Sequence, residues 1–247
     1  MTKLSVNLNK VALLRNTRTI GIPSVIDAAH TCMRAGADGI TVHPRPDQRH
    51  IKPSDVYELA EILTVEFNIE GNPFPDFVEM VHKVKPTQCT LVPDTPDAFT
   101  SDHGWDLSEH GEHLRRIIQE LKDLGIRISL FMDPDLDQIQ RAKEVGADRI
   151  ELYTEPYATA FREGEVEPVF QEYARAAKKA QQIGLGVNAG HDLNRENLGK
   201  FCSIPEILEV SIGHALIADA LEMGLFKTVQ EYLKILSQAK QGQESQR

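Results

Sequence analysis

The sequence contains one pattern twice, as GADGITVHP at residues 36–44 and as GADRIELYT at residues 146–154. In each copy a helical stretch ends at Gly-Ala-Asp, and an apolar strand follows at once. Polar side chains lie toward the end of each strand, with Thr41 and His43 in the first copy and Glu151 and Thr154 in the second. Internal similarity of this kind favours a repeated βα unit over two unlike domains.

Strand-like segments alternate with helical segments along the rest of the chain. The strands are expected at residues 3–7, 39–42, 66–72, 87–93, 127–133, within 146–154, and at 184–190 and 207–212. Helices are expected at residues 24–34, 53–63, 76–84, 106–124, 136–145, 165–183, 194–201, 215–223 and 226–239. Eight strands in this order predict α/β class and a single (β/α)8 TIM barrel with additional helices.

The domain organisation follows from the same pattern. We expect one barrel domain over residues 1–240 and a flexible tail over residues 241–247. A doubly wound open sheet is the alternative fold, but it usually carries a glycine-rich turn after its first strand. The segment LNKVALLR at residues 8–15 has no glycine, which favours the barrel.

Composition excludes several functional classes. The chain has 247 residues, 41% of them hydrophobic and 26% charged, as expected of a globular protein with a substantial core. Its net charge of −10 argues against general binding to nucleic acid or to anionic membranes. The three isolated cysteines predict neither a disulfide framework nor a metal site, and the absence of a leader or a spanning segment predicts a cytoplasmic protein.

Polar residues occur at the carboxyl ends of six of the expected strands. In a parallel barrel these ends share one mouth, where the active sites of such barrels are found. Two carboxylates and three imidazoles therefore converge with an amide, a set suited to proton transfer. The residues are Asn7, His43, Glu70, Glu151, His191 and His214.

Two further features of the mouth predict anion binding. Gly213 and His214 precede a helix after the eighth strand, where barrels often bind phosphate at a helix N-terminus. A second anion site could form from Arg45, Arg49 and His50 together with hydroxyls such as that of Thr100. The mouth is therefore expected to hold two phosphates or one bisphosphate.

Several motifs together make the chain resemble the pyridoxine 5′-phosphate synthase family. They are VNLNKVALLRNTR, GADGITVHPRPDQRHI, NIEGN, SLFMD, IELYT, VNAGHDL and SIGHALIADAL, and they span nearly the whole chain. The resemblance implies a cytoplasmic barrel enzyme that forms a homo-octamer and uses neither a metal nor an organic cofactor. It also implies a condensation of 3-amino-2-oxopropyl phosphate with 1-deoxy-D-xylulose 5-phosphate that closes a pyridine ring.

The same resemblance implies roles for individual residues. The catalytic groups fall on His43, Glu70 and His191, with Glu151 stabilising a transition state. The aminoketone phosphate would be held by Asn7, Arg18, Asp192, Gly213 and His214, and the deoxyxylulose phosphate by Arg45, His50 and Thr100. Asn9 and Lys10 fall among the ketose contacts.

The sequence departs from the family pattern at a few positions. Asn9 and Lys10 replace an aspartate and a histidine, so any acid-base duty of that aspartate is lost. Asp192 stands where glycine is more usual, and Glu155 and Pro156 replace a glycine-containing pair.

Other activities remain open from the residues alone. A metal-dependent sugar-phosphate isomerase or lyase could bind its metal through His43, Glu70, Glu151 and His191. A Schiff-base aldolase would need a strand-end lysine, for which Lys10 is the candidate. A barrel that binds sugar phosphates without turnover is the non-enzymatic alternative.

Overall fold

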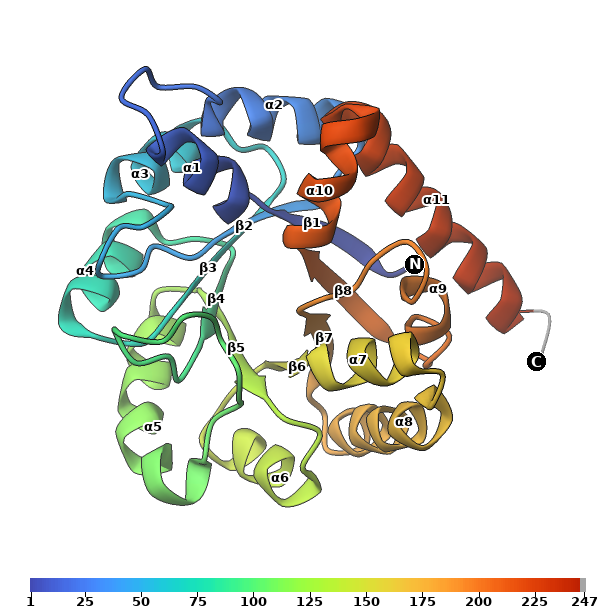
Figure 1. Cartoon of the computed structure of the whole chain (residues 1–247). Helices are drawn as coiled ribbons and strands as arrows, with labels where there is room; N and C mark the ends of the chain where they lie inside the picture. The colour runs from blue at the N-terminus through green and yellow to red at the C-terminus, as the bar shows by residue number, and fades with distance from the viewer. Residues whose placement is uncertain (245–247) are drawn as a thin grey trace.

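The structure is a computed structural model that describes residues 1–244, and it contains a closed parallel barrel (Figure 1). The strands pair in chain order, and β8 closes the ring on β1. The predicted (β/α)8 TIM barrel is thus confirmed. The strands are β1 (Lys3–Asn7), β2 (Gly39–Val42), β3 (Glu66–Gly71), β4 (Gln88–Leu91), β5 (Arg127–Met132), β6 (Arg149–Tyr153), β7 (Gly186–Gly190) and β8 (Ile207–Ile212).

The helices surround the strands as an outer ring in Figure 1. They are α1 (Asn9–Asn16), α2 (Val25–Ala35), α3 (Pro53–Ile62), α4 (Pro75–Val84), α5 (Leu107–Asp123), α6 (Leu136–Glu144), α7 (Glu155–Glu163), α8 (Val166–Gln182), α9 (Leu198–Phe201), α10 (His214–Met223) and α11 (Leu225–Glu244). Helices α1 and α7 were not predicted. Residues 241–244 of the expected tail continue α11, and residues 245–247 lie outside the described part of the chain.

The repeated Gly-Ala-Asp pattern performs the same structural task in both copies. Gly36 and Gly146 end their helices in the left-handed conformation, with φ of 101° and 98°. The carboxylates of Asp38 and Asp148 then each accept a backbone N–H from the preceding strand, at Leu4 and Ile128, both at 2.9 Å. Each aspartate therefore joins its own strand to the neighbouring strand at the amino-terminal edge of the barrel.

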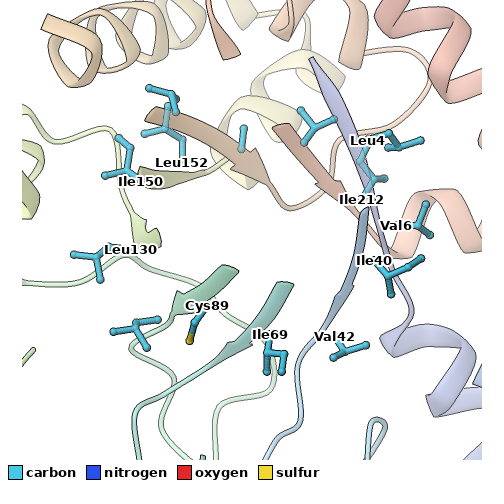
Figure 2. Packing of buried hydrophobic residues seen from close by; sticks show 14 of the residues in the cluster. Leu4, Val6, Ile40, Val42, Ile69, Cys89, Leu130, Ile150, Leu152 and Ile212 are labelled. Atoms are coloured by element: carbon cyan, nitrogen blue, oxygen red, sulfur yellow. The ribbon is translucent and has the colours of Figure 1, made fainter. Parts of the chain in front are cut away.

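The apolar core lies between the strands and the helices, because alternate residues of each strand point outward. Figure 2 shows such side chains, including Leu4, Ile40 and Leu130, all fully buried. Truncating one of them, as in Leu130→Ala, typically costs about 2–5 kcal/mol of stability. The core therefore holds the strands in register and fixes where each strand end lies.

The inward-facing residues of the barrel are largely polar. Ser5 hydrogen-bonds Thr41 at 2.7 Å, and the hydroxyl of Thr90 donates to Asn68 at 3.0 Å. At the amino-terminal end Glu66 pairs with both Lys3 and Arg127. Hydrogen-bonded polar groups therefore fill the barrel beneath the mouth. Within residues 1–244, each helix is too short or too polar to cross a lipid bilayer.

Candidate active site

Three neighbouring strands bring a histidine, a glutamate and two asparagines together at the mouth. His43 follows β2 and Glu70 lies in β3, with His43 Nδ1 at 4.0 Å from Glu70 Oε2. The amide of Asn7, the last residue of β1, donates to the same Glu70 oxygen at 3.5 Å. Asn9 accepts the backbone N–H of His43 at 2.9 Å and donates its own N–H to Asn7 Oδ1 at 3.0 Å. Adjacent strand ends therefore hold His43 and Glu70 in a fixed relation.

Burial sets the protonation of this pair. Desolvation, followed by the charge of Arg45, lowers the pKa of His43 well below its usual value. Desolvation, followed by the charge of Glu151, raises the pKa of Glu70 well above its usual value. The 4.0 Å separation permits an ion pair, but burial favours a neutral imidazole beside a protonated carboxyl. The pair therefore offers one proton acceptor and one proton donor.

Glu151 is a second carboxyl group buried at the mouth, with 3% of the residue exposed. Its Oε2 has no hydrogen-bond partner. Burial, followed by the charge of Glu209, raises the pKa of Glu151 to about 8. The carboxyl lies directly over Gly190, where an added Cβ would stand 2.3 Å from Glu151 Oε1. Glu151 is therefore a buried, protonated group with one free oxygen.

His191 lies on the other side of the mouth, directly after β7. Its ring contacts those of Phe131 and Tyr153, with centroids 5.5 and 5.3 Å away. Desolvation lowers the pKa of His191, while the adjacent carboxylate of Asp192 opposes that shift. His191 is therefore a second neutral imidazole available to accept a proton.

Arg45 lies at the rim of the mouth and is paired within the protein. Its guanidinium forms a buried ion pair with Asp94 and donates to the carbonyl oxygen of Ala98 at 2.9 Å. The hydroxyl of Ser101 also donates to Asp94, at 2.7 Å. A cavity of about 280 Å³ lies beside this group, and its lining includes His43, Arg45, Asn72, Phe74, Phe77 and Asp94.

Arg49 contacts the same loop as Arg45 but contributes differently. It donates to the carbonyl oxygens of Ala98 and Phe99, both at 3.1 Å, and pairs with Asp47 at 2.6 Å. These contacts give Arg49, which the sequence left without a separate role, a structural one. It anchors the loop that carries Thr100.

Two cations that follow β1, Arg15 and Lys10, have different roles. Arg15 binds Asp55 with two guanidinium nitrogens and also donates to the carbonyl oxygen of His50 at 3.2 Å. Lys10 is half-buried in the first turn of α1, and its charge lowers the pKa values of His50 and His191. Lys10 therefore contributes to the positive field of the mouth.

The remaining predicted residues lie around the rim. His50 is buried, its ring centroid is 6.3 Å from that of His43, and its Nδ1 accepts the N–H of Ile51. Gly213 packs on Asn7, because a Cβ added to this glycine would stand 3.2 Å from the Cβ of Asn7, and His214 begins α10. Among the predicted site residues, the exposed ones are Arg18, Thr100, Asp192 and His214. Among the described residues, no group of three or more histidine, cysteine or acidic side chains is placed to hold a metal ion.

Sequence reasoning missed several residues that shape this mouth. Asp94, which neutralises Arg45, follows β4 by three positions and was assigned only to a polar loop. Phe131 and Tyr153 stand at inward positions of β5 and β6 and form the wall beside His191. Strand alternation could have placed these two aromatic residues, because each lies two positions beyond an inward polar residue.

The chain is similar to known proteins over nearly its whole length. The family described as Pyridoxal phosphate biosynthesis protein PdxJ matches residues 4–238. A pyridoxine 5′-phosphate synthase of Porphyromonas gingivalis is 53% identical over 233 residues, covering 94% of this chain and 98% of that protein. The synthase of Bacteroides fragilis is 54% identical over 237 residues, covering 96% of this chain and all of the relative.

Solved structures of distant proteins share the fold alone. A chain of the Amycolatopsis orientalis BexX/CysO complex gives a TM-score of 0.65 at 15% identity and covers 99% of this chain and 92% of that one. N-(5′-phosphoribosyl)anthranilate isomerase from Pyrococcus furiosus gives 0.63 at 13% identity, covering 96% of this chain and all of the other. The family match spans nearly the whole barrel, every strand included, and the chain belongs to the PdxJ family of pyridoxal phosphate biosynthesis proteins.

Proposed function

We propose that the protein is a pyridoxine 5′-phosphate synthase. It condenses 3-amino-2-oxopropyl phosphate with 1-deoxy-D-xylulose 5-phosphate and releases inorganic phosphate and water as the pyridine ring closes. The observation that carries the proposal is the buried pair of His43 and Glu70, whose Nδ1 and Oε2 atoms lie 4.0 Å apart in a mouth flanked by cationic groups. Joining an amine to a ketone and then eliminating phosphate and water requires repeated proton transfers, which such a pair can perform.

The acid-base roles follow from the protonation states. His43 accepts protons and Glu70 donates them during condensation and elimination. His191, a neutral imidazole on the opposite wall, serves ring closure. Glu151 is protonated until positive charge develops nearby, and that charge lowers its pKa, so the carboxylate then stabilises a cationic intermediate.

The two phosphate groups bind on opposite sides of the mouth in this proposal. Gly213 and His214 offer the free amides of α10 and an imidazole side chain to the aminoketone phosphate. Asn7, Arg18 and Asp192 border that side. Arg45, His50 and Thr100 receive the ketose phosphate, which competes with Asp94 for the guanidinium of Arg45.

Asn9 and Lys10 keep part of the usual function in this site. Asn9 uses its side-chain oxygen to accept the N–H of His43, a role that needs no ionisation. Lys10 adds a cation that favours binding of phosphorylated ketose. In this proposal Asn9 and Lys10 are therefore compatible with ketose binding.

The cellular setting completes the proposal. The enzyme acts in the cytoplasm as a homo-octamer, a tetramer of dimers. It needs no metal or organic cofactor, and it binds neither nucleic acid nor membranes.

The test is a product assay on the purified protein. Pyridoxine 5′-phosphate should form, detected by its absorbance, only when both phosphorylated substrates are present. His43→Ala and Glu70→Gln should each reduce kcat by about 100-fold or more while changing the binding of either substrate far less. Unchanged turnover in both variants would exclude these residues as the acid and base.

The alternatives predict different results in the same experiment. Loss of activity with a chelator would favour a metal-dependent isomerase or lyase. Covalent trapping of substrate by borohydride at Lys10 would favour an aldolase. Binding of both phosphates without product would support a barrel that has lost turnover.

A further inference from the structure

The backbone that carries His191 is unusual in its conformation. His191 and the next residue, Asp192, have φ of 83° and 57°, so two consecutive non-glycine residues lie in the left-handed region. This region is unfavourable for residues with a Cβ and persists only where neighbouring contacts hold it. The segment therefore needs partners that fix it.

Thr154 supplies the first set of contacts. It directly follows β6 and is fully buried. Its backbone N–H and its hydroxyl donate to the carbonyl oxygen of Gly190 at 2.9 and 2.7 Å, and the hydroxyl also contacts the carbonyl oxygen of His191. The hydroxyl of Thr154 therefore contacts the carbonyl oxygens of both Gly190 and His191, one before and one after the Cα of His191.

Asn197 supplies the second set, from the start of α9. It is 1% exposed, and its amide donates to the carbonyl oxygen of Asp192 at 3.1 Å. Its side-chain oxygen accepts the N–H of Asn194 at 2.8 Å. Asn197 is itself held, because the hydroxyl of Tyr157 donates to its carbonyl oxygen at 2.8 Å.

Three successive carbonyl oxygens, those of Gly190, His191 and Asp192, are therefore bound by two buried side chains far apart in the sequence. We propose that Thr154 and Asn197 are positioning residues that hold the ring of His191 at the mouth of the barrel. The aromatic rings of Phe131 and Tyr153 then limit where this ring can turn. Neither Thr154 nor Asn197 touches the reacting atoms in this arrangement.

The surroundings of the His191 ring determine how its pKa changes when the ring is displaced. Desolvation is the largest cause of the lowered pKa of His191, so a ring that moves into water should regain a pKa nearer 6.5. The charged and titratable groups that act on the ring are His43, Asp94, Asp192, Arg45 and Lys10. None of these is altered by a substitution at Thr154 or Asn197.

Two substitutions test the proposal separately. Thr154→Val removes the hydroxyl at nearly constant shape, and Asn197→Leu removes the donor to Asp192 and the acceptor from Asn194 at similar shape without adding a charge. Each should lower kcat by about 10- to 100-fold, since a misplacement of about 1 Å costs that much, with KM changed less than about threefold. The acidic limb of the kcat profile should move to higher pH.

Matched controls separate positioning from a loss of stability. Thr154→Ser restores the hydroxyl and should return kcat to within about threefold of the parent value. Thr228→Val removes another buried hydroxyl, which donates to Gly224 at 3.0 Å in α11, and should leave kcat and its pH profile unchanged. Wild-type kcat and pH profile in Thr154→Val or in Asn197→Leu would overturn the role of that residue.

The assignment of a catalytic task to His191 rests on the proposed function, but its position can be measured without activity. Nuclear magnetic resonance titration of the His191 ring, assigned by the signal lost in His191→Gln, reports its pKa directly. We expect a higher pKa in Thr154→Val and Asn197→Leu than in the parent and in Thr228→Val. An unchanged ring pKa in both variants contradicts the positioning role, whereas a shift in a protein without synthase activity contradicts only the proposed function.

Discussion

Gly190 offers a direct test of how closely the site is built, because the carboxyl of Glu151 lies against its backbone. A Cβ at position 190 would stand 2.3 Å from Glu151 Oε1 and 3.3 Å from the carbonyl oxygen of Ser211. Ordinary contact to a Cβ begins at 3.4 Å. The contact to Ser211 involves a backbone atom, whereas the contact to Glu151 involves the end of a side chain. Gly190→Ala should therefore displace the carboxyl of Glu151 rather than the backbone.

The magnitude follows from that geometry. The carboxyl must move by about 1 Å, a displacement that costs about 100-fold in rate when it involves a catalytic group. Overpacking of this kind also costs about 1–3 kcal/mol of stability. Steady-state synthase kinetics measures the first effect, with kcat expected to fall and both KM values to change little, and chemical denaturation measures the second.

Gly199→Ala is the matched control for this substitution. Gly199 lies in α9, and its added Cβ would make only an ordinary contact, 3.7 Å from Ile235. This variant should keep parental kinetics, and its stability should be equal or higher by up to about 1 kcal/mol. If Gly190→Ala kept the parental kcat, Glu151 could not act at the position that the structure gives it.

Three further predictions concern charge. The pKa of Glu151 is raised from 4.5 to about 8 in the folded state, so the folded state binds this proton more tightly than the unfolded state. The free energy of unfolding should therefore fall as pH rises from about 4.5 to about 8. Glu151→Gln should therefore raise the free energy of unfolding at pH 8 much more than at pH 4.5, measured by denaturation at both values. Asp94→Asn leaves the buried guanidinium of Arg45 without its carboxylate, so stability should fall by about 3–5 kcal/mol and be partly restored by inorganic phosphate, as a thermal shift would show. Asp192→Asn removes a charge that raises the pKa of His191, so this pKa should fall in a ring titration, and an unchanged value would contradict the proximity of the two groups.

The fold was predictable because its signals are local. Strands such as Lys3–Asn7 and Ile207–Ile212 alternate apolar and polar residues, and glycines end most of the helices between them. Helix α1, which begins at Asn9, was missed because its N-cap residue is Leu8, whose side chain cannot cap a helix. Helix α7 was missed although Pro156 in its first turn and Gly164 after its last turn are ordinary helix signals.

The candidate site was predictable only in part. Barrel topology places strand ends together, so the grouping of Asn7, His43 and Glu70 followed from their positions alone. Partners that come from loops did not follow, because no periodic pattern fixes where a loop returns. The ion pair of Arg45 with Asp94 is one such contact. Protonation states were also beyond the sequence, since the raised pKa of Glu70 depends on its complete burial.

In the proposed mechanism this barrel makes pyridoxine 5′-phosphate with the acid-base pair of His43 and Glu70. The most direct measurement counts inorganic phosphate and pyridoxine 5′-phosphate in the same reaction, with both substrates and with each alone. We expect one phosphate per product, no product with either substrate alone, and loss of both signals together in His43→Ala. Phosphate released without product, or product formed at the parental rate by His43→Ala, would contradict it.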